Sequence, residues 1–488
     1  MNYYTLVIIA AMIASFCAVK WAYFKILKIA KVKNLVDNPD ARKLQKTPIP
    51  VLGGIAVFVG VTAGMLMAST LVNSFELQKT AYLIPVLMSM VVMLYIGAMD
   101  DILGLTPKSR FLIEILVILG LIYGGGGCVD SLHGVFGVGQ FSWWIGVPLT
   151  VFAGLGIINA VNMVDGVNGL SSGLCIAVAS LFGVVFIESG DTSNAILAFI
   201  MVASLIPFYI HNVFGNSSRM FIGDAGTMVM GIVLVWFTIS ILRSDTPVAY
   251  NSTNNELGLV AMTIAIMVVP IADTLRVMTM RMVHGKSPFS ADKTHLHHVF
   301  IAAGVSHFIT STSVILIDLV VAACWVLSVM MGLSVTCQLF LVIVLGMIFV
   351  WGTYAFIRYN EKKHTKFMHW LSKVSVSTHL GRKEWWKSIS AWLDAPEGEI
   401  HEEKLLDDDM KKVHDPLENH NLVMSYLKGK AEVHVSDIKM NSGADRSSVY
   451  PILYELERKG TINVYLRGEY DTPEIVALIS EGGVIYNQ

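Results

Sequence analysis

About eleven apolar runs, each long enough to cross the roughly 30 Å hydrocarbon core of a bilayer, constrain this chain more than any other feature. They lie near 4–26, 50–72, 80–99, 111–127, 143–162, 169–187, 194–212, 223–242, 257–279, 309–331 and 335–357. Of the 488 residues, 54% are hydrophobic and only 15% are charged, which excludes an ordinary soluble globular protein. The sequence predicts an all-α polytopic membrane protein with about 11 transmembrane helices and a small α+β tail.

The distribution of basic residues between the loops predicts the orientation of these spans. One set of loops carries little beyond Lys79 and Arg243. The other set carries Lys25, Lys28, Lys31, Lys33, Arg42, Lys43, Lys46, Lys108, Arg110, Arg219, Arg276, Arg281, Lys286 and Lys293. Because cytoplasmic loops are enriched in Lys and Arg, the basic loops are predicted to be cytoplasmic and the N-terminus to lie outside.

The same assignment places many acidic and histidine side chains on the cytoplasmic side. These are Asp100, Asp101, Asp165, Asp224, Asp292 and the histidines of the stretch "HLHH" at 295–298. Hydrophobicity alone gives no reason to gather such groups at helix ends, where burial is costly. We therefore expect one polar active site at the cytoplasmic surface.

The first two polar segments are a basic loop and an acidic pair. The loop "DNPDARKLQKTPIPVLGG" (37–54) includes Lys46 and could hold an anionic phosphate, or its lysines could simply reach the membrane surface. In "GAMDDILGL" (97–105), Asp100 and Asp101 are neighbours, so on a helix their side chains point about 100° apart. Two different roles are expected, one toward a metal and one toward a proton or hydrogen bond, with a hydrated helix cap as the alternative.

The third and fourth segments combine amides, carboxylates and glycines. In "NAVNMVDGVNGLSSG" (159–173), Asn159, Asn162 and Asp165 recur every three residues and share one helical face. They suit a hard cation and a sugar or nucleotide, or the asparagines could join membrane helices. In "FIGDAGTMVMG" (221–231), Asp224 stands at the head of a helix whose N-terminus favours anions, so it could hold Mg²⁺ beside a phosphate or act as an ordinary N-cap.

The fifth segment, 268–298, joins the ninth span to a polar loop. Asp273 and Arg276 are three residues apart on the predicted helix and could pair. Histidines that are neutral near pH 7 can bind zinc, but here they better suit hydrogen bonding to phosphate or diphosphate. The candidate residues further along are Arg281, Lys286, Asp292, His295, His297 and His298.

Together these segments resemble the polyprenyl-phosphate N-acetylhexosamine-1-phosphate transferase family over about 350 residues. The patterns "DD", "NxxNxxDG", "GDxG" and "SPFxxDxxHxHH" occur in the family's order. The last pattern is similar to the WecA and TagO branch, which uses UDP-GlcNAc, rather than the MraY branch, which uses UDP-MurNAc-pentapeptide. The chain departs from the family at Gln45, where a histidine is frequent, and at Asn168, where a second aspartate is frequent.

The resemblance implies transfer of GlcNAc-1-phosphate from a UDP-sugar to undecaprenyl phosphate, with release of UMP; an MraY-type transferase is the alternative. Mg²⁺, or Mn²⁺ in its place, is the expected cofactor, with Asp224 and Asp165 as ligands. Asp100 or Asp101 is expected to deprotonate or orient the lipid phosphate. The transfer itself could proceed by direct attack of the lipid phosphate or through a covalent aspartyl intermediate. The expected catalytic residues are Asp100, Asp101, Asp165, His297 and His298, and the expected substrate-binding residues are Lys46, Asn159, Asn162, Asn168, Arg281, Lys286 and His295.

The expected location is a bacterial inner membrane, with the active site and C-terminus in the cytoplasm. An anion transporter is the alternative from another class, but its functional charges should lie near mid-bilayer or on both faces. A membrane-anchored sensor needs far fewer spans. The expected partners are the membrane, undecaprenyl phosphate and a UDP-N-acetylhexosamine, with a homodimer left open.

The tail beyond the last span divides into three parts. Residues 358–395 contain Trp370, Trp385, Trp386 and Trp392 and predict an amphipathic segment at the membrane interface. Residues 396–415 are an acidic linker, and 416–488 resemble a winged-helix domain. Acidic residues outnumber basic ones in this last part, so we expect it to bind a protein partner rather than nucleic acid.

Overall fold

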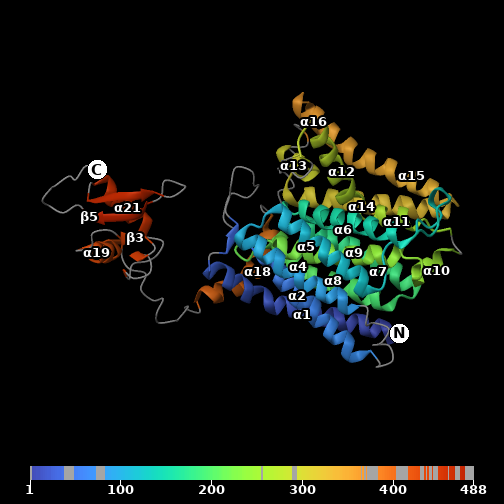
Figure 1. Cartoon of the computed structure of the whole chain (residues 1–488), viewed down its shortest axis with the longest axis horizontal. Coiled ribbons are helices and arrows are strands. Elements are labelled where there is room, and N and C mark those ends of the chain that lie inside the picture. The colour runs from blue at the N-terminus through green and yellow to red at the C-terminus, as the bar shows by residue number, and fades with distance from the viewer. Residues whose placement is uncertain are drawn as a thin grey trace. The chain divides into compact units, whose positions relative to one another are not determined.

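The computed structural model describes residues 3–33, 35–37, 49–72, 83–253, 256–287, 294–363, 365–367, 370, 383–402, 416–428, 433–435, 437–438, 442, 449–459, 461–467 and 473–478. The chain forms two units, Met1–Glu399 and Ile400–Gln488 (Figure 1). The first unit contains all of the apolar helices, and the fold class of an all-α polytopic membrane protein is confirmed.

Nine helices in the described part of the chain are long and apolar enough to cross a membrane. A tenth crossing results if α11 (Leu259–Ile266) and α12 (Val268–Val283), which meet at an 81° bend, form one span. The nine are α1 (Tyr3–Val32), α2 (Gly53–Leu71), α4 (Leu83–Leu103), α6 (Trp143–Met163), α7 (Leu170–Ser189), α8 (Thr192–Phe214), α9 (Gly223–Leu242), α14 (His307–Met330) and the continuous stretch Val335–Asn360.

The predicted span at 111–127 corresponds to α5 (Pro107–Gly125), which falls outside this group because it carries Lys108, Arg110 and Glu114. Its ends nevertheless lie beside the two ends of α9. Arg110 pairs with Asp224 at the start of α9, and the carbonyl of Gly125 accepts a hydrogen bond from Arg243 just beyond its end. Helix α5 therefore runs the full length of α9, in the same direction.

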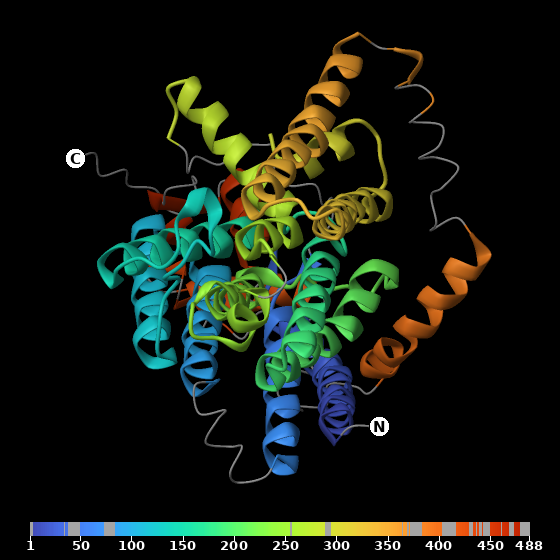
Figure 2. The ribbon, with the colours of Figure 1, turned by 90° about the vertical axis from the view of Figure 1, so that its right-hand side faces the viewer.

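Helix α9 lies in the middle of the first unit, with α1 and α2 on one side and α14 and α15 (Val335–Gly346) on the other (Figures 1 and 2). Nearly all of its residues are buried. Glycines allow α2 and α4 to approach its first turn closely. A β-carbon at Gly97 would lie 2.4 Å from the Cα of Ala225, and one at Gly54 would lie 2.2 Å from the backbone nitrogen of Gly226. The start of α9 is thus fixed by direct backbone packing.

The ninth predicted span, 257–279, is broken at Met267, between α11 and α12. The sequence does not predict this break, at which a buried acid satisfies the freed backbone. The Asp318 carboxylate of α14 accepts a hydrogen bond from the backbone N–H of Val269 at 2.8 Å. Asp318 is fully buried, so this bond pairs a backbone N–H at a depth where water does not reach it.

Shorter elements complete the first unit. Strands β1 (Val36–Asp37) and β2 (Ile49–Pro50) pair antiparallel and join the two ends of the first loop. Helix α18 (Glu384–Glu402) covers part of the predicted interfacial segment and continues beyond its predicted end at residue 395. The remaining elements are the 3₁₀ turn η1 (Val135–Gly137), α10 (Pro247–Thr253), α13 (Leu296–Ala302), the π-helical η2 (Met347–Gly352) and α16 (Thr353–Lys362).

The second unit has its own apolar core, which includes Val423, Leu453 and Val476. Its three strands form an antiparallel sheet in the order β3-β5-β4. The described elements are α19 (Pro416–Leu427), β3 (Val433–His434), α21 (Val449–Arg458), β4 (Ile462–Arg467) and β5 (Pro473–Leu478). The resemblance to a winged-helix domain stays a prediction.

Candidate active site

A cavity of about 580 Å³ lies where α4, α6 and α8 end and α7 and α9 begin. Five aspartates from four segments of the chain line it, among them Asp37 of β1, together with two histidines from α13. The predicted site residues in its lining are Asp100, Asp101, Asp165, Asn168, Asp224, His297 and His298. The structure therefore brings together most of the polar residues that sequence alone assigns to one membrane face.

Asp101 caps helix α9 from a neighbouring helix. Its Oδ1 accepts the backbone N–H of Asp224 at 2.9 Å, and its Oδ2 accepts that of Ala225 at 3.2 Å. The sequence predicts that this N-terminus binds an anionic phosphate, but the anion that it holds is the Asp101 carboxylate. This interaction satisfies two backbone donors that the helix leaves unpaired and complements its positive end.

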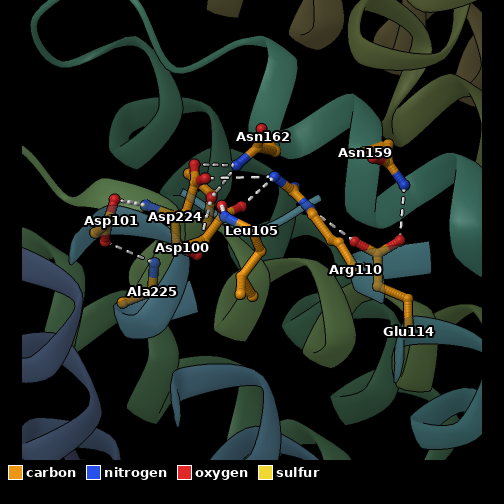
Figure 3. A network of polar contacts seen from close by, with 10 residues as sticks. Asp100, Asp101, Leu105, Arg110, Glu114, Asn159, Asn162, Asp224 and Ala225 are labelled. Carbon is orange, nitrogen blue, oxygen red and sulfur yellow. Dashed lines mark hydrogen bonds and ion pairs between the residues drawn. The ribbon is translucent and has the colours of Figure 1, made fainter. Parts of the chain in front are cut away.

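The Asp224 side chain is oriented through both of its oxygens. Asn162 donates to Oδ1 at 2.6 Å, and the Arg110 guanidinium lies 3.3 Å from Oδ2 (Figure 3). Asn162 also donates to Thr227 Oγ1 at 2.8 Å, which fixes the amide itself. Asp224 does not cap its own helix, so the alternative of an ordinary N-cap does not apply.

Arg110 connects Asp224 with two further carboxylates. Its Nη1 lies 3.1 Å from Asp100 Oδ2, and its Nε lies 3.0 Å from Glu114 Oε1 (Figure 3). Glu114 is completely buried and also accepts a hydrogen bond from Asn159 at 2.9 Å. Sequence reasoning missed Glu114. The available signal was a lone acid inside an apolar run, four residues after an arginine.

Asp165 lies in the loop between α6 and α7, outside the spans. Its Oδ1 accepts a hydrogen bond from Ser171 at 2.7 Å. Burial raises the pKa of Asp165 to about 6, although the Ser171 hydrogen bond acts in the opposite direction. Asn168, in the same loop, donates its backbone N–H to His307 Nδ1 at 3.3 Å.

The histidines of "HLHH" lie in two different environments. His295 pairs with Asp273 at 3.0 Å, and Asp273 also pairs with Arg276 at 2.7 Å, which confirms the predicted Asp273–Arg276 interaction. His297 and His298 face the cavity, with ring centroids 4.3 Å apart. Burial lowers the pKa of His297 well below its ordinary value, and the neighbouring His298 acts in the same direction. His297 is therefore neutral near pH 7.

Comparisons with known proteins show the family of this chain. Residues 83–242 match the model of glycosyl transferase family 4. The undecaprenyl-phosphate alpha-N-acetylglucosaminyl 1-phosphate transferase of Escherichia coli (strain K12) is 33% identical over 304 residues, which cover 60% of this chain and 76% of that protein. The protein of the same description from Yersinia pestis is 31% identical over 302 residues, 60% of this chain and 76% of its own length. The chain belongs to glycosyl transferase family 4.

A third relative has a similar description. The probable undecaprenyl-phosphate N-acetylglucosaminyl 1-phosphate transferase of Bacillus subtilis (strain 168) is 32% identical over 302 residues, 62% of this chain and 79% of that protein. The match to glycosyl transferase family 4 includes the segments that carry Asp100, Asp101, Asp165 and Asp224. The family match thus covers four of the five aspartates that line the cavity, all but Asp37.

In this member of glycosyl transferase family 4, the other predicted substrate-binding residues occupy different positions. Three of them do not line the cavity and contact other polar residues instead. Asn159 contacts Glu114, Asn162 contacts Asp224 and His295 contacts Asp273. Arg281 is buried in α12 and Lys286 is exposed after it, and neither lines the cavity. Their roles in substrate binding stay predictions, and Lys46 and Asp292 lie outside the described residues.

The donor set of the cavity fits a hard cation. Carboxylate oxygens are the ligands that Mg²⁺ prefers, and Mg²⁺ is commonly held by one or two carboxylates with substrate phosphates and water. In the described ranges no three His, Cys, Asp or Glu side chains are arranged to hold a metal on their own. A complete three- or four-ligand zinc site is therefore not formed by these residues.

Proposed function

We propose that this chain transfers GlcNAc-1-phosphate from UDP-GlcNAc to undecaprenyl phosphate, giving a lipid-linked diphosphate sugar and UMP. The observation that carries the proposal is one cavity at the ends of membrane helices, lined by four aspartates that lie within the family match. Relatives at 31–33% identity bear this activity in their names. Such a reaction starts the assembly of a glycan on a lipid carrier.

The substrates explain why a cation belongs in the cavity. A lipid monophosphate and a UDP-sugar are both anionic, so carboxylates alone would repel them. We assign Asp224 and Asp165 as the residues that would hold Mg²⁺, with Mn²⁺ as a substitute. When bound, the ion supplies charge neutralisation at the diphosphate and at the departing UMP.

The geometry distributes the remaining roles among the chain's own residues. Both oxygens of Asp101 accept α9 amides, so its contribution is to hold the first turn of α9 and hence Asp224. We assign Asp100 to orient or deprotonate the lipid phosphate, because it lines the cavity and its Oδ2 pairs with the same Arg110 that pairs with Asp224. His297 and His298 face the same space and would donate hydrogen bonds to phosphate oxygens.

We further propose that the cavity faces the cytoplasm of a bacterial inner membrane, with the N-terminus outside. The excess of Lys and Arg in loops at that end supports this orientation. The aspartates lie at helix ends, in keeping with a surface reaction. A transporter would need such charges along a path through the bilayer.

The direct test supplies purified protein in lipid nanodiscs with Mg²⁺, undecaprenyl phosphate and a panel of UDP-sugars, and measures UMP release. We expect UMP with UDP-GlcNAc, and loss of about 100-fold or more in kcat/KM for Asp224→Asn. Asp245→Asn is a matched control, because Asp245 is an exposed aspartate just beyond the opposite end of the same helix. Absence of UMP with every sugar from folded protein contradicts the proposal.

Stereochemistry at the transferred phosphorus separates the two chemical routes. Inversion indicates one displacement by the lipid phosphate, and retention indicates two displacements through a covalent enzyme intermediate. We expect inversion, because the assigned roles make the lipid phosphate itself the nucleophile, which requires one displacement.

A further inference from the structure

Asp394, on helix α18, binds the loop that joins α8 to α9. The backbone N–H of Asn216 donates to both carboxylate oxygens at 3.2 Å, and that of Ser217 donates to Oδ2 at 3.2 Å. Ser218 donates its backbone N–H at 3.0 Å and its hydroxyl at 2.6 Å, both to Oδ1. Three successive N–H groups form a concave anion site, and charge-assisted hydrogen bonds of this kind are strong.

Apolar contacts hold α18 in the position that this binding needs. Trp386 packs on Phe214 at the end of α8, with ring centroids 4.5 Å apart, and on Phe308 at the start of α14, at 5.9 Å. Leu393 is buried beside Asp394. Exposed apolar side chains, Trp385, Ile389 and Trp392, form the other stripe of the helix. Such a stripe suits the membrane interface, so α18 lies along the first unit with one face on protein.

Helix α1 holds the opposite edge of the same loop. The Tyr23 hydroxyl donates to the carbonyl of Ser218 at 2.8 Å, and the Lys31 ammonium donates to the carbonyl of Ser217 at 2.9 Å. Asp394 therefore accepts hydrogen bonds from the backbone amides of Ser217 and Ser218, and side chains of α1 donate hydrogen bonds to the carbonyls of the same two residues. Without Asp394, the loop keeps only one of its two sides fixed.

The loop leads directly into the candidate active site. Phe221, Ile222 and Gly223 line the cavity, and Asp224 follows them. Asn212 donates to the carbonyl of Met220 at 2.9 Å, which transmits the position of the loop to this wall. A shift of about 1 Å in such a wall can cost about 100-fold in rate, because the reacting groups lose their alignment.

We propose that Asp394 is a positioning residue of the active site, and that α18 is a strap that fixes the loop before Asp224 from outside the bundle. The proposal rests on the proposed function. The boundary between the two units, at Glu399 and Ile400, falls within α18 itself. Asp394 and the loop that it binds both belong to the first unit, and the chain continues from the end of α18 into the second unit.

The test compares the full-length protein with Asp394→Ala and Asp394→Asn in nanodiscs. Amide hydrogen exchange at residues 216–218 and kcat for UMP release are both measured. We expect Asp394→Ala to raise exchange at these amides by about 10-fold and to lower kcat by about 10-fold. Asp394→Asn keeps one acceptor oxygen and should lie between the two. Glu384→Ala, which removes an exposed carboxylate of the same helix, should change neither quantity.

Added acetate gives a readout that a general loss of packing would not move. Acetate should refill the vacated amide site and restore part of kcat in Asp394→Ala, but not in Asp224→Asn. Faster exchange with an unchanged kcat, or a loss of kcat that acetate does not restore, overturns the proposal. Unchanged exchange in both Asp394 variants also overturns it. If the wild-type protein releases no UMP, the proposed function fails, whereas the exchange data still test the contact.

Discussion

One guanidinium, that of Arg110, connects three carboxylates from three helices. Because Arg presents several donors in a rigid plane, it can reach Asp100, Asp224 and Glu114 at once. A lysine carries a single ammonium on a flexible stem and cannot reproduce this geometry. The position of Asp224 therefore depends on an arginine that lies beside the cavity rather than in its lining.

Replacing Arg110 by lysine tests this dependence. We expect Arg110→Lys to lower kcat by about 10- to 100-fold with a smaller effect on KM, since alignment rather than binding is disturbed. Steady-state UMP release measures both. Arg243→Lys is the matched control, because Arg243 also pairs with an aspartate but lies beyond the other end of α9. Equal losses in both variants would show that the effect is not specific to the site.

Asp394 predicts a dependence of stability on pH. Burial alone would raise the pKa of Asp394, but the hydrogen bonds from Ser218, Asn216 and Ser217 outweigh it and hold the pKa below the ordinary value of about 4. The folded state therefore prefers the ionised form. Its contribution to stability is present above about pH 4 and is lost as the pH falls through the lowered value.

Comparing Tm of the wild type with that of Asp394→Asn checks this sign. Since asparagine does not titrate, we expect the wild type to have the higher Tm at pH 7 and the difference to shrink as the pH falls below about 4. Thermal unfolding in nanodiscs across this range measures it. A difference that grows on acidification would contradict the assignment.

Single residues show what the sequence can and cannot predict. Asp100, Asp101, Asp165 and Asp224 could be grouped in advance because the positive-inside rule places them at one end of the spans. The hydrogen-bond partner of each of these residues could not be predicted, because the partners come from different helices. Asp101 binding the amides of α9, and Asn159 binding Glu114, depend on helix packing that no local pattern contains.

Among the elements, α9 is the one whose position depends most on its neighbours. Helix α4 packs against its first turn at Gly97. Gly97→Ala places a methyl group 2.4 Å from the Cα of Ala225, so the first turn of α9 must move. We expect a loss of about 100-fold in kcat/KM and a lower Tm. Gly120→Ala, in α5, is the control because a β-carbon there meets nothing within 4 Å. It should be neutral or slightly stabilising. Similar losses in both variants would contradict this account of the packing.

The elements also show where periodicity and composition stop being sufficient. Long apolar runs predict the positions of most helices, because the bilayer fixes their length and polarity. The bend between α11 and α12 could not be located in this way, since it is stabilised by Asp318 from α14. A lone acid within the predicted span 309–331 indicates a buried polar partner, but does not identify it.

At the scale of the whole molecule, the two units differ in what their sequences disclose. The first unit has alternating apolar and basic segments, which predict both architecture and sidedness. The second has a small core of its own, yet its sequence carries no motif that specifies a ligand. Within the first unit, the contact of α18 with the loop before α9 is a tertiary feature, since Asp394 and its three amide donors lie far apart along the chain.

Sidedness is a property of the whole chain and follows from a single assignment of the two membrane faces. Cysteine labelling tests it. With the exposed Cys17 and Cys337 replaced by serine, Gly139→Cys and Lys286→Cys introduce exposed thiols at opposite ends of the helices. Gly139 precedes α6, whose far end approaches the cavity, whereas Lys286 follows α12 at the end that carries the basic loops.

A membrane-impermeant maleimide applied to intact cells should label Gly139→Cys and leave Lys286→Cys unlabelled until the cells are permeabilised. The physical reason is that Lys and Arg resist translocation, so the proposed orientation keeps the basic loops and the aspartate cavity on the cytoplasmic side. Activity of each variant in the UMP assay is the control for correct insertion. Labelling of Lys286→Cys alone in intact cells would contradict the proposed orientation.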